Sequence, residues 1–337
     1  MSELRQDLVS GDWIIMAPER GKRPHDFLPK KKKRVVSPKA TCPFEDLEAS
    51  GNWPLRAQYP AKGPWQIAVI RNKYPALKRE DWCAMEMRNG PYSYLEGIGH
   101  HDLVITKDHT KNLAELSISE AVNLFLMMQK MYRRFAKDGC SRYVSTFANW
   151  GPSAGASLYH PHYQILALPI VPPDVTHSLE GSKEYFAKRH RCVHCDMLLF
   201  EWEAGTRVIE GNEQAIGVAP FVSRQPFEVR VYPTQHVSRF EEASIKDIKG
   251  AVEVLQGVLR RMKQNLNDPD FNFFIHTAPL EAKEQHGHYH WHIEIFPKIS
   301  IPAGFELSTG VDVNVVLPEE GAAFLRGERK SSRAKDV

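Results

Sequence analysis

Residues 149–164 read Asn149-Trp-Gly-Pro-Ser-Ala-Gly-Ala-Ser-Leu-Tyr-His160-Pro-His162-Tyr-Gln164, and an apolar stretch at 165–171 follows them. Side chains two positions apart on a strand point to the same side, so His160 and His162 are predicted to share one face. The glycines before them let an anionic group approach the backbone, and the proline between them fixes one torsion. This pattern is typical of a histidine that attacks a phosphorus atom. The alternative is a pair of surface histidines in a loop.

The composition is that of an ordinary globular chain. It has 337 residues, 42% of them hydrophobic, which is enough for two or three average domains. The N-terminus lacks an apolar signal region and no run approaches the roughly 18 apolar residues of a membrane span, so we expect a cytoplasmic protein with no membrane partner. A formal net charge of +3 argues against a nucleic-acid partner. The basic cluster at residues 30–34 is expected to be a solvated loop, with a nucleic-acid or nuclear-import patch as the alternative.

The same order of elements occurs twice along the chain. The first set is 67–75, 101–105, 107–109, a long helix after residue 117 and the strand 160–164; the second is 215–221, 227–233, 234–236, a long helix after residue 244 and the strand 288–292. His109 and His160 are 51 positions apart, and His236 and His290 are 54 apart. Each half therefore brings a histidine before its helix to a histidine on its last strand, which indicates a duplication.

Both long helices are predicted to begin with a capping box, Ser117 with Glu120 and Ser244 with Asp247. Apolar residues then recur at helical spacing, as expected for a helix that packs on a sheet.

Strands joined by short turns favour an antiparallel or mixed sheet. The predicted fold class is therefore α+β: two tandem repeats, each a mostly antiparallel sheet with helices packed on it. We divide the chain into 1–173, which carries His162, then 174–326, and a polar tail at 327–337 that is expected to be disordered. The equivalent edges of the two repeats favour either one joined sheet or a homodimer.

Cysteine and histidine spacing predicts a metal site in the second half. Cys192-Val-His-Cys195 supplies two thiolates on a predicted tight turn, and the repeat brings His236 and His290 together. Two sulfur and two nitrogen ligands suit tetrahedral Zn²⁺, here in a structural role. A redox Cys-x-x-Cys is the alternative, although such a motif normally begins a helix after a strand. With five cysteines in all, the close pair favours metal or redox chemistry over a disulfide framework.

The corresponding set in the first half is Cys42, Glu45, His109 and His160. A carboxylate stands where a second thiolate would be expected, and carboxylate oxygen is an acceptable zinc ligand. A metal on His160 would fix the loop that holds His162 without taking part in the chemistry. The alternative is that Cys42 is a buried apolar residue and that no metal binds.

Together these motifs resemble one family over nearly the whole chain, the galactose-1-phosphate uridylyltransferases and their relatives in the histidine-triad superfamily. The matching pieces are 13–24, 42–44, 71–77, 108–109, 149–164 and 304–314. The resemblance implies two histidine-triad repeats in one molecule that pairs as a homodimer. It also implies that His162 is the nucleophile and that Gln164 donates to the transferring phosphate. The substrate contacts that it implies are Arg20, Arg23, Asn72, Asn149, Ser153, Gly155, Ser157, Gly304, Phe305 and Asn314.

The chemistry that this resemblance implies is nucleotidyl transfer. A neutral imidazole attacks the α-phosphorus of a nucleotide sugar, a hexose 1-phosphate leaves, and a second sugar phosphate reverses the step. Phosphate is a good leaving group, so alignment and charge stabilisation by Gln164, the arginines and backbone amides near Gly155 are the main requirements. The main hypothesis is a UDP-glucose:hexose-1-phosphate uridylyltransferase of galactose metabolism. Because 304–314 also resembles plant-type ADP-glucose phosphorylases, adenylyl transfer is the alternative, and a zinc-bound interaction module is the non-enzymatic one.

Overall fold

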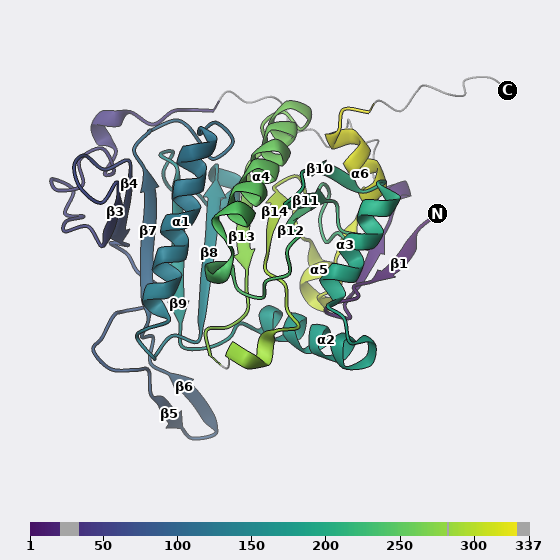
Figure 1. Ribbon diagram of the computed structural model, residues 1–337, viewed down its shortest axis with the longest axis horizontal. Helices are drawn as coiled ribbons and strands as arrows, with labels where there is room; N and C mark the ends of the chain where they lie inside the picture. Colours follow the sequence, from purple (N-terminus) through teal and green to yellow (C-terminus); the bar gives the residue numbers. More distant parts are fainter. Residues whose placement is uncertain (21–33, 282, 329–337) are drawn as a thin grey trace.

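The computed structural model describes residues 1–20, 34–281 and 283–328. Its centre is one sheet of ten strands (Figure 1). The first half contributes β3 (Ala57–Tyr59), β4 (Ile67–Arg71), β7 (His100–Thr106), β8 (Tyr143–Trp150) and β9 (His162–Leu168). The second half contributes β10 (Val208–Gly211), β11 (Ala215–Val218), β12 (Val229–Pro233), β13 (Phe271–His276) and β14 (His292–Pro297).

The strand order shows the duplication directly. It runs β10-β11-β12-β14-β13-β8-β9-β7-β4-β3, so the order outward from β8 is matched by the order outward from β13. These two strands pair antiparallel at the centre, with Asn149 opposite Asn272. The predicted α+β fold of two repeats is confirmed, and the two halves share a joined sheet within one chain. The division at residue 173 stays a proposal.

Two long helices, α1 (Ile118–Phe135) and α4 (Ile245–Asn265), lie side by side across one face of the sheet (Figure 1). Both begin with the predicted capping boxes. Alternate residues of β9 pack beneath them, among them Tyr163 and Ile165, while His162 and Gln164 lie on the opposite face and stay partly exposed. The buried core under the helices is continuous across both halves. This alternation places the candidate catalytic side chains on the open face of the first half.

A reciprocal pair of glutamines joins the halves. The buried Gln129 of α1 donates through Nε2 to the carbonyls of Phe240 and Ala243, which precede α4, at 2.6 and 3.1 Å. The buried Gln256 of α4 donates in the same way to the carbonyls of residues 113 and 116, which precede α1, at 2.8 and 2.9 Å. The duplication therefore extends to individual hydrogen bonds.

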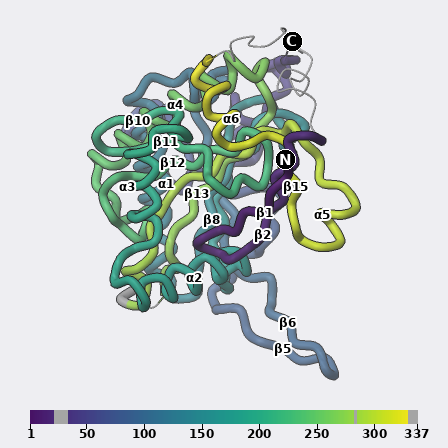
Figure 2. Tube along the Cα trace, turned by 90° about the vertical axis from the view of Figure 1, so that its right-hand side faces the viewer, coloured from purple at the N-terminus to yellow at the C-terminus, as the bar shows by residue number. Residues whose placement is uncertain are grey.

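Smaller elements surround this core. The strands β1 (Glu3–Gln6), β2 (Trp13–Met16) and β15 (Val313–Asn314) form a small sheet, and the hairpin β5 (Glu86–Asn89) with β6 (Tyr92–Leu95) projects from the body (Figure 2). The remaining α-helices are α2 (Pro173–Arg189), α3 (Val193–Ala204), α5 (Gly304–Thr309) and α6 (Pro318–Leu325). In the described part of the chain, no helix combines the length and the apolar character needed to cross a membrane.

Two expectations need correction here. A disulfide joins Cys83 to Cys140, 57 positions away, and ties the loop before β5 to the turn after α1. The cysteine spacing carried no local signal for this pair. Arg34 is half-buried and ion-paired: its guanidinium contacts Asp268 at 2.6 Å and Asp270 at 2.8 Å. The rest of the basic cluster, at 30–33, lies outside the described residues, as do 329–337 of the expected tail.

Candidate active site and metal centres

The nucleophile candidate occupies the first position of β9. His160 precedes the strand and is buried, so the two histidines do not share a strand face as expected, and only His162 belongs to β9. The Nδ1 atom of His162 lies 2.9 Å from the carbonyl oxygen of His160. A carbonyl can only accept, so Nδ1 carries the proton and the lone pair is on Nε2. Burial lowers the pKa of His162, which favours this neutral form.

Gln164 follows on the same face of β9 and is oriented by His101 of β7. The amide N–H of Ala76 donates to Nδ1 of His101 at 3.0 Å, so the neutral ring carries its proton on Nε2. That atom lies 2.9 Å from Oε1 of Gln164, and burial lowers the pKa of His101. The Nδ2 atom of Asn72 lies 3.0 Å from the same Nε2, where it faces a second donor, while Oδ1 of Asn72 accepts from the amide of Tyr74 at 2.9 Å. Because Oε1 accepts from His101, the NH₂ group of Gln164 is left for a ligand.

The loop between β8 and His160 is shaped by two glycines. Gly151 and Gly155 both have φ of 85°, in the region that favours glycine. The amides of Gly155 and Ala156 donate within the loop, at 3.0 and 3.1 Å, rather than outward as expected from the sequence. The amide of Ser153 donates to the Asp270 carboxylate at 2.8 Å. Ser153, Gly155 and Ser157 are exposed at the surface of this loop.

The other predicted contact residues are more scattered. Arg20 is exposed at the end of a short 3-10 helix, and Arg23 lies outside the described residues. Gly304 and Phe305 begin α5, where both are exposed. Asn314 is buried; its side chain donates to the carbonyl of Ser223 and accepts from the amide of residue 316, both at 2.9 Å. That pattern gives Asn314 a structural role, which the sequence did not indicate.

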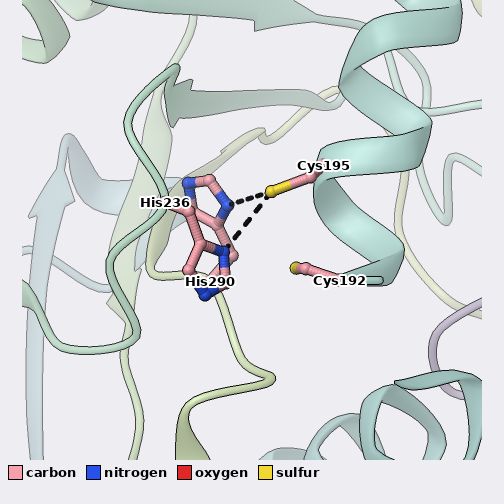
Figure 3. Close-up of side chains that lie close together, drawn as sticks. All are labelled: Cys192, Cys195, His236 and His290. Atoms are coloured by element: carbon pink, nitrogen blue, oxygen red, sulfur yellow. Dashed lines mark hydrogen bonds between the residues drawn. The ribbon is translucent and has the colours of Figure 1, made fainter. Parts of the chain in front are cut away.

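Four side chains converge in the second half, as predicted (Figure 3). One ligand atom from each of Cys192, Cys195, His236 and His290 lies within 4.8 Å of every other. The Nε2 atoms of His236 and His290 donate to the carbonyls of Gly287, at 2.8 Å, and of Pro233, at 3.0 Å. Both Nδ1 atoms are therefore unprotonated and face Cys195 Sγ, at 3.4 and 3.6 Å. Such backbone partners are typical of metal-binding histidines.

The cysteines begin a helix instead of lying in a loop. Cys192 is the N-cap residue of α3 and Cys195 lies in its first turn. Interaction with Cys195 above all, and then with His236 and His290, holds the pKa of Cys192 well below its usual range. The motif follows the helix α2 and not a strand, and its histidine neighbours favour metal binding over redox chemistry.

The first half repeats the arrangement with one oxygen ligand. Ligand atoms of Cys42, Glu45, His109 and His160 lie within 4.8 Å of one another. Glu45 Oε1 is 2.9 Å from Nδ1 of His109 and 3.6 Å from Nδ1 of His160. The two Nε2 atoms donate at 2.7 Å to the carbonyls of Ser37 and Thr106. Thr106 and Pro233 each stand three residues before the first histidine of their group. The carbonyl that accepts from the second histidine of each group is therefore also duplicated.

Comparisons with known proteins agree with this geometry. A family model described as a domain of unknown function (DUF4921) matches residues 69–328. The chain is 34% identical to the ADP-glucose phosphorylase of Arabidopsis thaliana, over 96% of this chain and 92% of that protein. It is 28% identical to the galactose-1-phosphate uridylyltransferase of Thermotoga maritima, over 97% and 98%. The crystal structure of the Arabidopsis thaliana phosphorylase with bound ADP-glucose matches with a TM-score of 0.82 and 31% identity, covering 97% of this chain and 99% of that one.

The chain belongs to the galactose-1-phosphate uridylyltransferase-like family of the histidine-triad superfamily. A uridylyltransferase structure matches with a TM-score of 0.74 and 26% identity over 97% of this chain and 98% of that one, so the likeness spans both halves. Members of this family are nucleotidyltransferases and phosphorylases that act on nucleotide sugars. The comparisons favour the adenylyl alternative over the uridylyl hypothesis that the sequence analysis placed first.

Proposed function

We propose that this protein transfers a nucleoside monophosphate from a nucleotide sugar through a covalent nucleotidyl-histidine on His162, and that its preferred pair is ADP-glucose with inorganic phosphate. The observation that carries the covalent step is the unprotonated Nε2 of His162, since Nδ1 keeps the proton and donates it in a hydrogen bond to the carbonyl of His160. The choice of donor is supported by the likeness to a phosphorylase whose crystal structure holds ADP-glucose. Uridylyl transfer with galactose 1-phosphate is the second candidate, supported by the Thermotoga maritima relative.

The side chains divide the work as follows. Nε2 of His162 attacks the α-phosphorus of ADP-glucose, the bond to the leaving oxygen breaks, and glucose 1-phosphate departs. Gln164, held by His101, donates its NH₂ group to a phosphate oxygen as negative charge develops. Inorganic phosphate then attacks the adenylyl-histidine, which releases ADP and restores the neutral imidazole. The sugar phosphate is a good leaving group, so alignment is the main contribution of the protein.

Intact mass spectrometry tests the covalent step. Folded protein mixed with ADP-glucose or UDP-glucose, without acceptor, should gain the mass of one nucleoside monophosphate. His162→Gly should abolish both the adduct and turnover without unfolding the chain. His190→Gly is the matched control, since His190 is an exposed histidine with φ of 54° at the end of α2. An adduct that persists in His162→Gly, or no adduct with either donor in folded wild type, contradicts the proposal.

A donor panel tests the substrate. ADP-glucose, UDP-glucose, UDP-galactose and GDP-glucose are each offered with inorganic phosphate or galactose 1-phosphate, and hexose 1-phosphate release is measured. We expect ADP-glucose with inorganic phosphate to give the highest kcat/KM. A preference for UDP-glucose with galactose 1-phosphate would reverse the ranking of donors and leave the role of His162 intact.

We also propose that both four-residue groups bind Zn²⁺. Thiolate and imidazole ligands suit this ion, which would pin α3 in the second half and the loop before His162 in the first. Metal analysis should find about two equivalents per chain, and Cys195→Ser should remove one and lower Tm sharply. The carboxylate oxygen of Glu45 is a harder ligand than a thiolate sulfur, so graded chelation should remove Zn²⁺ from the first-half group first. Simultaneous loss of both equivalents would contradict this ranking, and an unchanged metal content in Cys195→Ser would contradict the assignment.

A further inference from the structure

The central strand pair brings a side chain of the second half against the substrate loop of the first. Asn272 of β13 lies opposite Asn149 of β8. Its Nδ2 atom donates at 2.8 Å to two acceptors, the carbonyl oxygen of Ala154 and the Oδ1 atom of Asn149. Both asparagines are partly exposed on the open sheet face, where they line a cavity of about 360 Å³ together with Phe147, Phe274 and Lys298.

These contacts fix the polarity of both amides. The carbonyl of Ala154 can only accept, so Asn272 must turn its nitrogen towards the loop. The same nitrogen faces Asn149, which must therefore present its oxygen to Asn272. The NH₂ group of Asn149 then lies on the side of Gly155, where a Cβ added to that glycine would be 3.7 Å from Nδ2. Asn149 is thus held as a hydrogen-bond donor towards the loop.

Asp270, the residue before β13, holds the backbone of the same loop. Asp270 accepts from the amide of Ser153 at 2.8 Å and packs so closely on Gly151 that a Cβ there would clash with its carboxylate. Asp270 also contacts Arg34 at 2.8 Å. Asp270 therefore fixes the backbone of the loop, while Asn272 fixes the side chain of Asn149.

We propose that Asn272 is a positioning residue that holds Asn149 as a donor to an acceptor oxygen of the nucleotide sugar, in its phosphate or sugar portion. This inference rests on the proposed function. An anionic diphosphate offers only acceptors, so a site that binds it needs donors aimed in advance. Gln164 provides one donor through His101 of the first half, and Asn149 provides a second through Asn272 of the other half. The second repeat thereby contributes to a reaction whose nucleophile is in the first.

The test reverses the polarity of Asn272 without changing its shape. In Asn272→Asp the new carboxylate cannot donate to Asn149, so the amide of Asn149 turns and offers its oxygen to the substrate. The ADP-glucose concentration that gives half-maximal adduct formation in single turnovers should rise about tenfold or more. Asn265→Asp is the matched control, because Nδ2 of Asn265 donates in the same way to the carbonyl of Leu325 at 2.9 Å, between α4 and α6.

A double-mutant cycle separates positioning from a structural role. In an Asn149→Ala background, Asn272→Asp should change the half-saturating ADP-glucose concentration less than twofold, because there is no amide left to orient. An equal effect with and without Asn149, or no effect in either, overturns the proposal. If wild type forms no adduct, the proposed function fails separately, and the same four proteins are then compared by calorimetric binding of ADP-glucose. The same coupling in binding would support the positioning role, and its absence would overturn it.

Discussion

Seven described histidines each donate one ring N–H to a backbone carbonyl, and in the five that belong to the candidate sites the choice of nitrogen differs between the proposed roles. In His109, His160, His236 and His290 the donor is Nε2, which leaves Nδ1 directed at a metal group. In His162 the donor is Nδ1, which leaves Nε2 unprotonated on the open sheet face. The proposed metal ligands and the proposed nucleophile thus each donate one ring N–H to a backbone carbonyl, through opposite nitrogens.

At the scale of one residue, Gly151→Ala should damage the substrate loop. Its φ of 85° costs an L-residue about 1–2 kcal/mol, and the new Cβ would in addition collide with Asp270. Gly63→Ala is the control: Gly63 has the same φ, but a Cβ there meets nothing within 4 Å. Urea denaturation should show a larger loss of stability for Gly151→Ala than for Gly63→Ala, together with slower adduct formation. Equal losses would show that the contact with Asp270 is unimportant.

Local sequence pointed to His162 and to both metal groups, but not to His101 or Asn272. The first set carries its own signal, a His-Pro-His-x-Gln run and spacings that recur in the two halves. His101 acts on Gln164 across 63 positions, and Asn272 acts on Asn149 across 123. Their roles follow from strand register alone, which a single sequence does not specify.

Among the elements, the capping box of α1 gives a pH-dependent contribution to stability. Hydrogen bonds from the side chain and then the backbone of Ser117 lower the pKa of Glu120 below 4.5. The folded state therefore favours the carboxylate, and this stabilisation is present above pH 4.5 and is lost as the pH falls through the lowered pKa. Ser117→Ala should cost about 1 kcal/mol at pH 7.

Urea denaturation of wild type and Glu120→Gln at several pH values measures that contribution. The difference in free energy of unfolding should be largest above pH 4.5 and shrink at lower pH. Glu184→Gln in α2, whose carboxylate contacts Lys188 at 3.6 Å on an exposed face, should show little such dependence. A difference for Glu120→Gln that is independent of pH would contradict the linkage.

Helix starts were easier to predict than the boundaries of the histidine-bearing strands. The two capping boxes predicted the starts of α1 and α4 because their residues act within three positions of each other. The start of α3 was missed, because Cys192 caps it without a side-chain hydrogen bond. The strands were expected to include His160 and His290, but both precede their strands, where ring hydrogen bonds hold them in the metal groups.

For the whole molecule, the sequence predicted a duplication but left open how the halves combine. The structure joins them through β8 and β13, through one continuous core and through the reciprocal glutamines. The spacing of Gln129 to Arg133 recurs as Gln256 to Arg260. Each arginine donates to the glutamine of its own helix and to a backbone carbonyl of the other half. This signal was present in the sequence, but its meaning depends on a contact between helices more than 100 positions apart.

The reciprocal glutamines predict that the halves unfold together. Gln129→Leu and Gln256→Leu each remove the donor to two buried carbonyls, which should cost about 1–3 kcal/mol apiece. The two sites share no partner, so the losses should add in the double variant. Urea unfolding followed by fluorescence and by circular dichroism should give one coincident transition for every variant. Separate transitions, with each substitution shifting only one of them, would show instead that the two repeats are independent folding units that merely share a sheet.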